Sequence, residues 1–373
     1  SSDEGPSIPD DEKHTVWVVG DSTVSAYDTL QGYYAKYGYG TQLQTYFDGY
    51  YVVNNIAASG RSSKSYLTES KAAYEKLTTQ IKSGDVLIIG FGHNDEKHEV
   101  PRYTSPVGDY NTEGSFAKSL YDNYVKIALV KGAQPILCTP IVRRSKTDTL
   151  SDKDCHIVAG ETITSGDNAG TYEGGNYAQA IIDLGAAVNV PVVDLTALTK
   201  ALYEEIGAEG TLYMHQWTGK TSNTVDNTHL NIYGAKKVAH MLATEIDKWK
   251  AETSEWKDID IAQHVKNLDK IPTKENDLVE NPGFTSSDPG YKPPTTGSTL
   301  WENYGIFKGT AFGALGGTPN KTNYTFGKDD NNNMRIMVSN NKGKLSNDQN
   351  GIAMYYYQIP ADSIFELSAK ATV

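Results

Sequence analysis

The sequence predicts a three-layer α/β/α sandwich with a parallel sheet at its centre, followed by a partial β-rich module of the β-sandwich type. Two observations predict the sandwich. Short apolar runs recur between residues 15 and 194, and each ends at, or is followed by, glycine, asparagine, aspartate or proline. Segments with helical spacing of apolar residues separate these runs, and they are long enough to cross over between parallel strands.

Five apolar runs are the predicted strands of the sheet: residues 15–19, 51–55, 86–91, 135–139 and 190–194. The spacing of apolar residues predicts crossover helices at 115–131 and 177–188. A closing amphipathic helix is predicted at 233–250. Its apolar side chains share one face, and they are Val238, Met241, Leu242, Ile246 and Trp249.

The chain is predicted to contain four segments. Residues 1–13 are polar and acidic and should form a flexible tail, and residues 14–252 form the α/β domain. Residues 253–294 are typical of a linker, because they are polar and contain prolines. Residues 295–373 alternate turn-forming and strand-like runs, which predicts a β-rich accessory module. The final run, 365–373, lacks a following turn or partner strand, so we expect an incomplete module of a longer multimodular protein.

The composition excludes several classes of partner. Basic residues number 34 and acidic residues 46, which gives a net charge of −12, and no lysine- or arginine-rich run stands out. We therefore expect neither nucleic acid nor an anionic membrane surface as a partner. No stretch approaches the roughly 20 apolar residues that span a bilayer. A start at Ser1 without methionine and a composition rich in tyrosine, asparagine and threonine suggest a secreted, extracellular protein.

The two cysteines, Cys138 and Cys155, leave two alternatives open. They lie 17 residues apart, and a disulfide between them would stabilise the fold by about 3 kcal/mol. Two separate buried thiols are the other possibility. Two cysteines are too few for a fold that depends on a disulfide framework.

Ser22 is the candidate nucleophile, because it follows the first predicted strand in the sequence Gly20-Asp21-Ser22-Thr23. Ligands of open α/β sheets bind at the carboxyl ends of the strands. The pattern is not the G-x-S-x-G elbow of another hydrolase fold, since Val24 stands where that motif has glycine. A serine after a strand is also a common helix cap, so this motif alone does not establish a nucleophile.

Asp226 and His229 provide the partners that a serine nucleophile needs. An imidazole must take the hydroxyl proton, and a carboxylate must orient the imidazole. Both residues stand in the sequence Asp226-Asn227-Thr228-His229, directly before the predicted closing helix. One loop can therefore carry both side chains. An isolated D-x-x-H pattern more often marks an aspartate that caps a helix beside a surface histidine.

Two further strand ends offer hydrogen-bond donors for a tetrahedral oxyanion. Gly60 lies in the loop after the second strand, and glycine lets a backbone N–H approach a ligand closely. Asn94 follows the third strand in the sequence Gly92-His93-Asn94-Asp95, and its amide can donate directly. Each feature alone indicates only a turn. Four fitting residue types at the ends of successive elements indicate an acyl-transfer site.

These four blocks resemble the sequence blocks of the SGNH (GDSL-like) hydrolase superfamily, which implies a flavodoxin-like α/β fold. The resemblance covers roughly residues 14–250. More narrowly, the chain is similar to rhamnogalacturonan acetylesterases, enzymes that remove acetyl groups from pectin. This similarity is carried by GDST at 20–23, NNIAASGRSSKSY at 54–66, TPIVRR at 139–144 and DNTHLNIYGA at 226–235.

The resemblance implies a role for each residue of the four blocks. Ser22 would be the nucleophile, His229 the general base and later the general acid, and Asp226 the carboxylate that orients it. The oxyanion would meet the backbone N–H groups of Ser22 and Gly60 and the side-chain amide of Asn94. The implied mechanism passes through an acetyl-enzyme and requires neither a metal nor an organic cofactor.

Five residues are candidates for substrate binding. Arg61 and Arg143 lie in loops predicted at the catalytic edge, where they can pair with a galacturonate carboxylate. Tyr172 is a candidate for stacking on a sugar ring, and His93 for lining the pocket. Solvated surface positions are the alternative for the arginines. Tyr177 is a second candidate for stacking on a sugar, with packing in the core as its alternative. The long polar stretch 145–176 is predicted to form one wall of the site.

The sequence therefore predicts a secreted serine esterase that deacetylates plant cell-wall polysaccharide, with pectic rhamnogalacturonan as the first candidate. The alternatives are an acetylxylan esterase, a lipase or thioesterase of the same fold, and a non-catalytic glycan-binding protein. The missing apolar lid argues against lipids, and the complete residue set argues against a non-catalytic protein. The polar run 329–333 is expected to be a hairpin loop, with calcium binding as the alternative.

Overall fold

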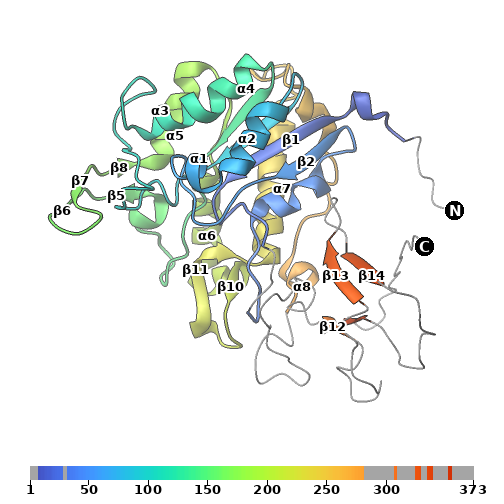
Figure 1. The fold of residues 1–373 in the computed structure, drawn as a ribbon. Coiled ribbons are helices and arrows are strands. Elements are labelled where there is room, and N and C mark those ends of the chain that lie inside the picture. The colour runs from blue at the N-terminus through green and yellow to red at the C-terminus, as the bar shows by residue number, and fades with distance from the viewer. Residues whose placement is uncertain are drawn as a thin grey trace. The chain divides into compact units, whose positions relative to one another are not determined.

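The computed structural model describes residues 7–27 and 32–280, together with the backbone of four short strands beyond them. The chain divides into two compact units. The first consists of Ser1–Tyr27 and Tyr34–Leu278, and the second of Asp28–Tyr33 and Val279–Val373. The first unit contains the α/β fold (Figure 1).

A parallel five-stranded sheet forms the centre of the first unit (Figure 1). In spatial order its strands are β2 (Tyr51–Asn55), β1 (His14–Gly20), β3 (Val86–Gly90), β4 (Gln134–Cys138) and β9 (Val192–Val193). The register places Val16 of β1 opposite Val53 on one side and Val86 on the other. The predicted sandwich and the five predicted strands are confirmed.

Alternate side chains of β1 enter two separate hydrophobic cores, because successive residues of a strand point to opposite faces. Trp17 and Val19 belong to one core, and Val16 and Val18 to the other. The Trp17 face is covered by α2 (Lys71–Gln80), α5 (Tyr177–Val188) and the continuous run of α3 (Phe116–Leu120), the π-helical turn η3 (Tyr121–Val125) and α4 (Lys126–Val130). The predicted helix 177–188 is confirmed, and the predicted helix 115–131 contains this π-helical turn.

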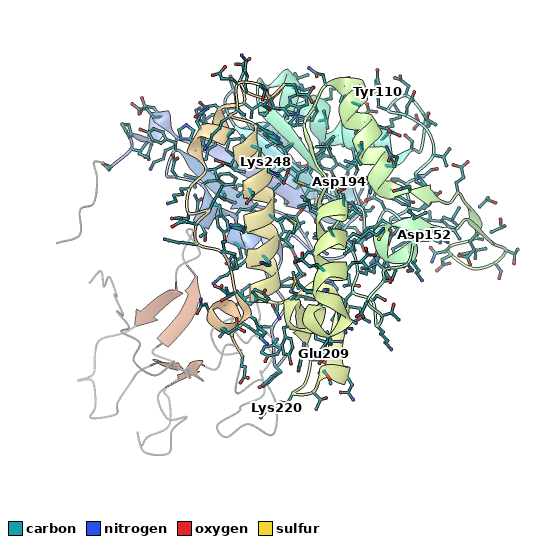
Figure 2. All side chains as sticks on the ribbon, turned by 180° about the vertical axis from the view of Figure 1, so that it is seen from behind. Tyr110, Asp152, Asp194, Glu209, Lys220 and Lys248 are labelled. Carbon is teal, nitrogen blue, oxygen red and sulfur yellow. The ribbon has the colours of Figure 1, made fainter. Side chains whose placement is uncertain are left out.

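The opposite face of the sheet is covered by α7 (Ile232–Lys248), α6 (Leu195–Thr211) and the 3-10 helix η2 (Tyr39–Tyr46). Figure 2 shows α6 and α7 side by side, with Asp194 at the start of α6 and Lys248 at the end of α7. The Asp194 side chain caps α6 by accepting from the Ala197 N–H at 3.0 Å. The closing helix predicted at 233–250 corresponds to α7.

Small hairpins occupy two of the connections. Between β4 and α5, β5 (Ile157–Val158) pairs with β8 (Gly175–Asn176), and β6 (Glu161–Ile163) with β7 (Gly170–Tyr172). Before α7, β10 (His215–Trp217) pairs with β11 (Val225–Leu230). The remaining short elements are η1 (Asp10–Glu12), α1 (Tyr66–Glu69), η4 (Lys153–Cys155), η5 (Leu212–Met214), η6 (Ser222–Thr224), η7 (Asp260–His264) and α8 (Lys274–Asp277).

In the second unit, two antiparallel strand pairs are described. Strand β12 (Ile306–Lys308) pairs with β15 (Ile352–Met354), and β13 (Tyr324–Lys328) with β14 (Met334–Val338). The predicted hairpin loop 329–333 lies outside the described residues, although the strands on either side of it pair. The predicted accessory module lies mostly outside the described residues as well, so its extent stays a prediction.

Cys138 and Cys155 are separate buried thiols, which decides between the two alternatives left by the sequence. Burial raises the pKa of Cys138 to about 12, and it also raises the pKa of Cys155. Among the described residues, no helix combines the length and the apolar character that a bilayer crossing requires.

Asp85 joins the start of β3 to β1 through a buried carboxylate that is 1% exposed. Its Oδ1 accepts from the Thr15 N–H at 2.9 Å, and its Oδ2 accepts from Trp17 Nε1 at 3.1 Å. The ammonium of Lys82 reaches Oδ1 at 2.9 Å and balances the charge. This carboxylate therefore satisfies donors on the strand that leads to Ser22.

We expect Asp85→Ala to lower the free energy of unfolding by about 2–4 kcal/mol, because it leaves the half-buried donor of Thr15 and the buried donor of Trp17 without an acceptor. Urea unfolding followed by tryptophan fluorescence measures this loss. The control is Asp122→Ala, which removes an exposed ion pair with Lys118 and should change the stability by less than about 0.5 kcal/mol. Equal losses in the two variants would contradict the role of Asp85.

Candidate active site

Ser22 lies in a tight turn directly after β1. The Asp21 carboxylate fixes this turn, because its Oδ1 accepts from Thr23 N at 2.9 Å and from Thr23 Oγ1 at 2.7 Å. Burial raises the pKa of Asp21, while the two Thr23 bonds oppose that rise. A Cβ at Gly20 would lie 2.7 Å from the carbonyl oxygen of Gly90, so only glycine lets β1 and β3 approach this closely.

A hydrogen-bonded chain connects Ser22, His229 and Asp226. The Oγ of Ser22 lies 2.9 Å from Nε2 of His229, and Nδ1 of His229 lies 2.9 Å from Oδ2 of Asp226. A carboxylate can only accept, so the proton of the neutral ring sits on Nδ1. The Nε2 atom is then free to accept the proton of the serine hydroxyl. Sequence reasoning brought these three residues together, and the structure does the same.

The second oxygen of Asp226 is fully engaged by its own loop. Its Oδ1 accepts from the N–H of Thr228 at 2.7 Å and from the N–H of His229 at 2.8 Å. Burial acts to raise the pKa of Asp226, but the hydrogen bonds and charge of His229 and the bond from Thr228 outweigh it. The pKa therefore lies well below its usual range, and Asp226 is ionised at any working pH of an esterase.

Three donors are available for an oxyanion beside Ser22. Gly60 has φ +76°, a conformation that favours glycine, in the loop after β2. Among the described residues, the N–H groups of Ser22 and Gly60 donate to no protein acceptor. Asn94 is 6% exposed and uses one amide hydrogen on the carbonyl of Arg61 at 3.0 Å, which leaves its second hydrogen for a ligand.

Arg102 is a neighbour of this oxyanion hole that the sequence analysis missed. Its Nη1 lies 3.4 Å from Oδ1 of Asn94, so the amide presents its oxygen to a cation and its nitrogen to the Arg61 carbonyl. A Cβ at Gly60 would lie 3.6 Å from Nη2 of Arg102, and Glu99 holds the guanidinium at 3.3 Å. Arg102 belongs to no sequence motif. The folding of the loop after β3 brings it to the site, and no local pattern in the sequence indicates this.

Arg61 and Tyr172 use their binding groups within the protein. The guanidinium of Arg61 donates to Ser70 Oγ at 2.9 Å and to the Glu69 carbonyl at 3.2 Å. Tyr172 is 4% exposed, and its ring stacks on His98 with 4.8 Å between centroids. The structure therefore places Arg61 in a loop anchor and Tyr172 in ring packing, and it does not offer an open face of Tyr172 to a sugar.

His93 is buried beside the site, with 2% of its surface exposed. Neither ring nitrogen has a hydrogen-bond partner among the described residues, and its ring meets that of His156 edge-on at 4.5 Å. Burial, together with the charges of His156 and Arg143, lowers the pKa of His93 well below its usual range. His93 therefore remains neutral and presents one donor and one acceptor.

Arg143 lines a cavity of about 1000 Å³ together with Glu96 and residues 157–161. Its Nη1 lies 2.5 Å from Oε1 of Glu96, a residue that the sequence analysis did not select. The hairpin strands β5 and β6 contribute to the lining of this cavity, which includes none of the three catalytic candidates. A wall of the catalytic site formed by the stretch 145–176 therefore stays a prediction.

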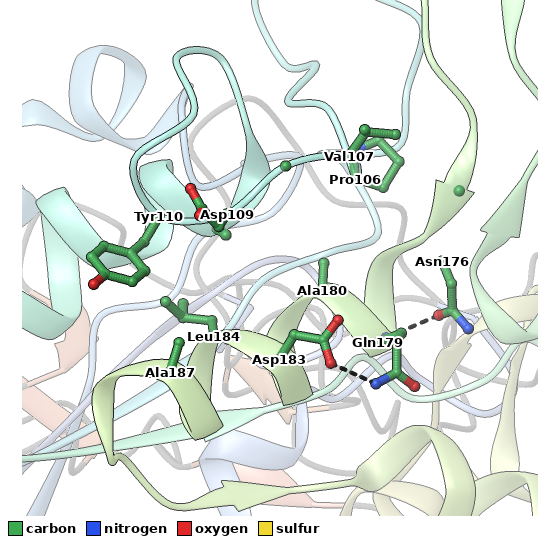
Figure 3. A pocket seen from close by; sticks show the side chains of 13 residues that line it. Pro106, Val107, Asp109, Tyr110, Asn176, Gln179, Ala180, Asp183, Leu184 and Ala187 are labelled. Atoms are coloured by element: carbon green, nitrogen blue, oxygen red, sulfur yellow. Dashed lines mark hydrogen bonds between the residues drawn. The ribbon is translucent and has the colours of Figure 1, made fainter.

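A second cavity, of about 380 Å³, contains no residue of the four blocks. Pro106, Tyr110 and Leu184 are among its lining residues, and Figure 3 shows Gln179 bonded to Asp183 along α5, on one side of the cavity. In the part of the chain that the structure describes, no group of three potential ligand side chains has the geometry to hold a metal ion.

Comparison with known proteins agrees with this geometry. The family model of the GDSL-like lipase/acylhydrolases matches residues 16–242. The rhamnogalacturonan acetylesterase RhgT of Bacillus subtilis is 32% identical over 239 residues, which cover 62% of this chain and 89% of RhgT. The probable rhamnogalacturonan acetylesterase YesY of the same organism is 29% identical, over 62% of this chain and 91% of YesY.

Among solved structures, the YxiM protein of Bacillus subtilis is similar at 25% identity and a TM-score of 0.47. The similarity covers 64% of this chain and 58% of that one. The family match spans all four blocks, from the strand before Ser22 to the helix after His229. The chain is therefore a serine carboxylic ester hydrolase that belongs to the GDSL-like lipase/acylhydrolase family.

Proposed function

We propose that this esterase removes O-acetyl groups from acetylated rhamnogalacturonan, a plant cell-wall pectin. The observation that carries the proposal is the hydrogen-bonded chain of Asp226, His229 and Ser22, with 2.9 Å at each link beside three free donors. The choice of substrate is supported by the 32% identity to a rhamnogalacturonan acetylesterase over 89% of that enzyme's length.

The first step is acylation of Ser22. Its Oγ attacks the acetyl carbonyl carbon while Nε2 of His229 takes the hydroxyl proton. The tetrahedral oxyanion accepts hydrogen bonds from the N–H groups of Ser22 and Gly60 and from the free amide hydrogen of Asn94. The carbon–oxygen bond to the sugar then breaks, and the sugar hydroxyl leaves with the proton from His229.

The second step returns the enzyme to its starting state. His229 takes a proton from water, and the resulting hydroxide attacks the acetyl group on Ser22 in the same oxyanion hole. The bond between Oγ and the acetyl carbon breaks, acetate leaves, and Oγ recovers its proton from His229. Asp226 stays ionised throughout, so it stabilises the imidazolium that forms in both steps.

We also propose that the enzyme acts outside the cell, because a cell-wall polymer is too large to reach an internal enzyme. The proposal predicts that cells producing the full-length protein release acetylesterase activity into the medium. Activity confined to the cell interior would contradict it.

Acetate release from three substrates tests the proposed activity. We expect turnover of acetylated rhamnogalacturonan, weaker turnover of acetylated xylan, and little hydrolysis of a long-chain nitrophenyl ester. Ser22→Ala removes the nucleophile and should lower kcat by at least about 10⁴-fold without loss of the fold. Ser83→Ala, an exposed serine before β3, serves as the control and should keep the wild-type rate.

The outcome on xylan separates the candidate substrates. Preference for acetylated xylan would keep the esterase and replace its substrate, and activity on the long-chain ester alone would indicate a lipase. Retained turnover in Ser22→Ala would contradict the nucleophile.

We expect Asp226→Asn to lower kcat by about 10³- to 10⁴-fold with a small change in KM. The two backbone N–H groups of Thr228 and His229 need the one oxygen that remains, so the new amide nitrogen must face Nδ1 of His229. The ring then carries its proton on Nε2 and cannot accept from Ser22. Steady-state kinetics measure the loss, with the exposed Asp122→Asn as control. A loss below about tenfold would show that Asp226 does not set the tautomer.

A further inference from the structure

We propose that Arg143, held by Glu96 and His156, forms a carboxylate-binding subsite that recognises a uronic acid unit next to the acetylated sugar. The inference rests on the proposed function, since it supposes a polysaccharide in the active site. The inference goes further in two respects. It states that the enzyme recognises the negative charge of the polymer, and it names the residues that do so.

Arg143 lies between the two loops that carry the catalytic groups. Glu96, its ion-pair partner, comes two residues after Asn94 of the oxyanion hole. The next residue along the chain, Arg144, is bound to the other catalytic loop, because its N–H donates to the Asn227 carbonyl at 2.7 Å. Its guanidinium also donates to the side chain of Asn227 at 3.2 Å. Arg143 is therefore connected to both catalytic loops, through Glu96 to one and through Arg144 to the other.

Two buried residues hold Arg143 in place. Glu96 is 8% exposed, and its Oε1 and Oε2 accept from Arg143 Nη1 at 2.5 Å and from His156 Nδ1 at 2.9 Å. His156 is completely buried, and its Nε2 lies 2.7 Å from the carbonyl oxygen of Ile141. Both ring nitrogens of His156 lie within hydrogen-bond distance of an oxygen atom, and Nη1 of Arg143 lies 3.5 Å from its Nδ1.

Glu96 holds the cluster of Arg143, Glu96 and His156 together through its two carboxylate oxygens. Its Oε1 faces the Arg143 guanidinium, and its Oε2 faces the His156 ring. Burial acts to raise the pKa of Glu96, but the bonds and charges of His156 and Arg143 lower it, so the carboxylate stays ionised.

The free edge of Arg143 is accessible from the cavity. Its side chain is 15% exposed, and Nε and Nη2 have no acceptor among the described residues. A guanidinium edge with two free donors matches the two oxygens of a carboxylate. Lys97 and Lys153 line the same cavity and add positive charge, and Asp152 on the same lining opposes it. The opposing acid Glu161 is paired with His98 at 2.6 Å.

The geometry favours a planar carboxylate on a polymer. Arg143 is fixed at one end by Glu96, so its remaining donors keep a defined direction, and bidentate binding depends on such a direction. A sugar hydroxyl can replace only part of this interaction, because it has no charge. The subsite therefore distinguishes an acidic polysaccharide from the same polysaccharide with its carboxyl groups reduced to alcohols.

Acetate release from acetylated rhamnogalacturonan and from its carboxyl-reduced form tests the subsite. We expect the full-length wild-type enzyme to prefer the acidic polymer, and Arg143→Gln to lower the ratio of the two kcat/KM values by roughly tenfold, mainly through KM. Glu96→Gln keeps the shape of the positioning residue but removes its charge, and should lower the same ratio by a smaller factor. The control, Lys131→Gln, removes one exposed charge at the end of α4 and should leave the ratio unchanged.

A second test measures how oligosaccharides inhibit the hydrolysis of p-nitrophenyl acetate. This test does not require the enzyme to deacetylate either polymer. An unacetylated oligogalacturonate should inhibit the wild type competitively, its carboxyl-reduced form should inhibit weakly, and Arg143→Gln should bind the acidic form roughly tenfold less well. If neither polymer releases acetate but the acidic inhibition is present, the proposed function fails and the subsite stands. Equal inhibition by the charged and the reduced oligosaccharides would overturn the subsite. An inhibition constant for the acidic form that is unchanged in Arg143→Gln would overturn it as well.

Discussion

The hydrogen-bonded chain from Asp226 through His229 to Ser22 is the interaction on which the function of the fold depends. It needs a serine from the first strand of the sheet and an Asp-His pair that follows it by about 200 residues to meet within 2.9 Å. A parallel sheet makes this possible, because the carboxyl ends of its strands share one edge. The turn after β1 supplies the serine there, and the loop before α7 supplies the other two residues.

Hydrogen bonds of buried polar side chains fix the positions of the loops around the active site. Asp95 connects the Gly60 loop to the loop after β3, since it accepts from Ser63 N at 2.9 Å and from Thr104 Oγ1 at 2.7 Å. Tyr177 of α5 donates to the Thr104 carbonyl at 2.7 Å and ties the same loop to the helical layer. The loops that carry the oxyanion donors thus depend in part on Thr104 and Tyr177, which lie outside the four blocks.

The part of the structure that could be predicted from the sequence is the part with local signals. Apolar runs located the strands, helical spacing located α5 and α7, and the four blocks located the triad and the oxyanion donors. The π-helical turn η3 was not predicted, because its apolar spacing differs little from that of an α-helix. Arg102 and His156 were not predicted either, since long-range loop packing brings them to the site and no nearby sequence pattern records it.

The most direct test of the central claim is detection of the acetyl-enzyme. Rapid quenching during turnover of an acetylated substrate, followed by peptide mass analysis, locates any acetyl group on the chain. The account predicts one acetyl group on the peptide that contains Ser22, and a larger fraction of this adduct when deacylation is slowed. Turnover without an adduct on that peptide, or with the acetyl group on another residue, would contradict Ser22 as the nucleophile.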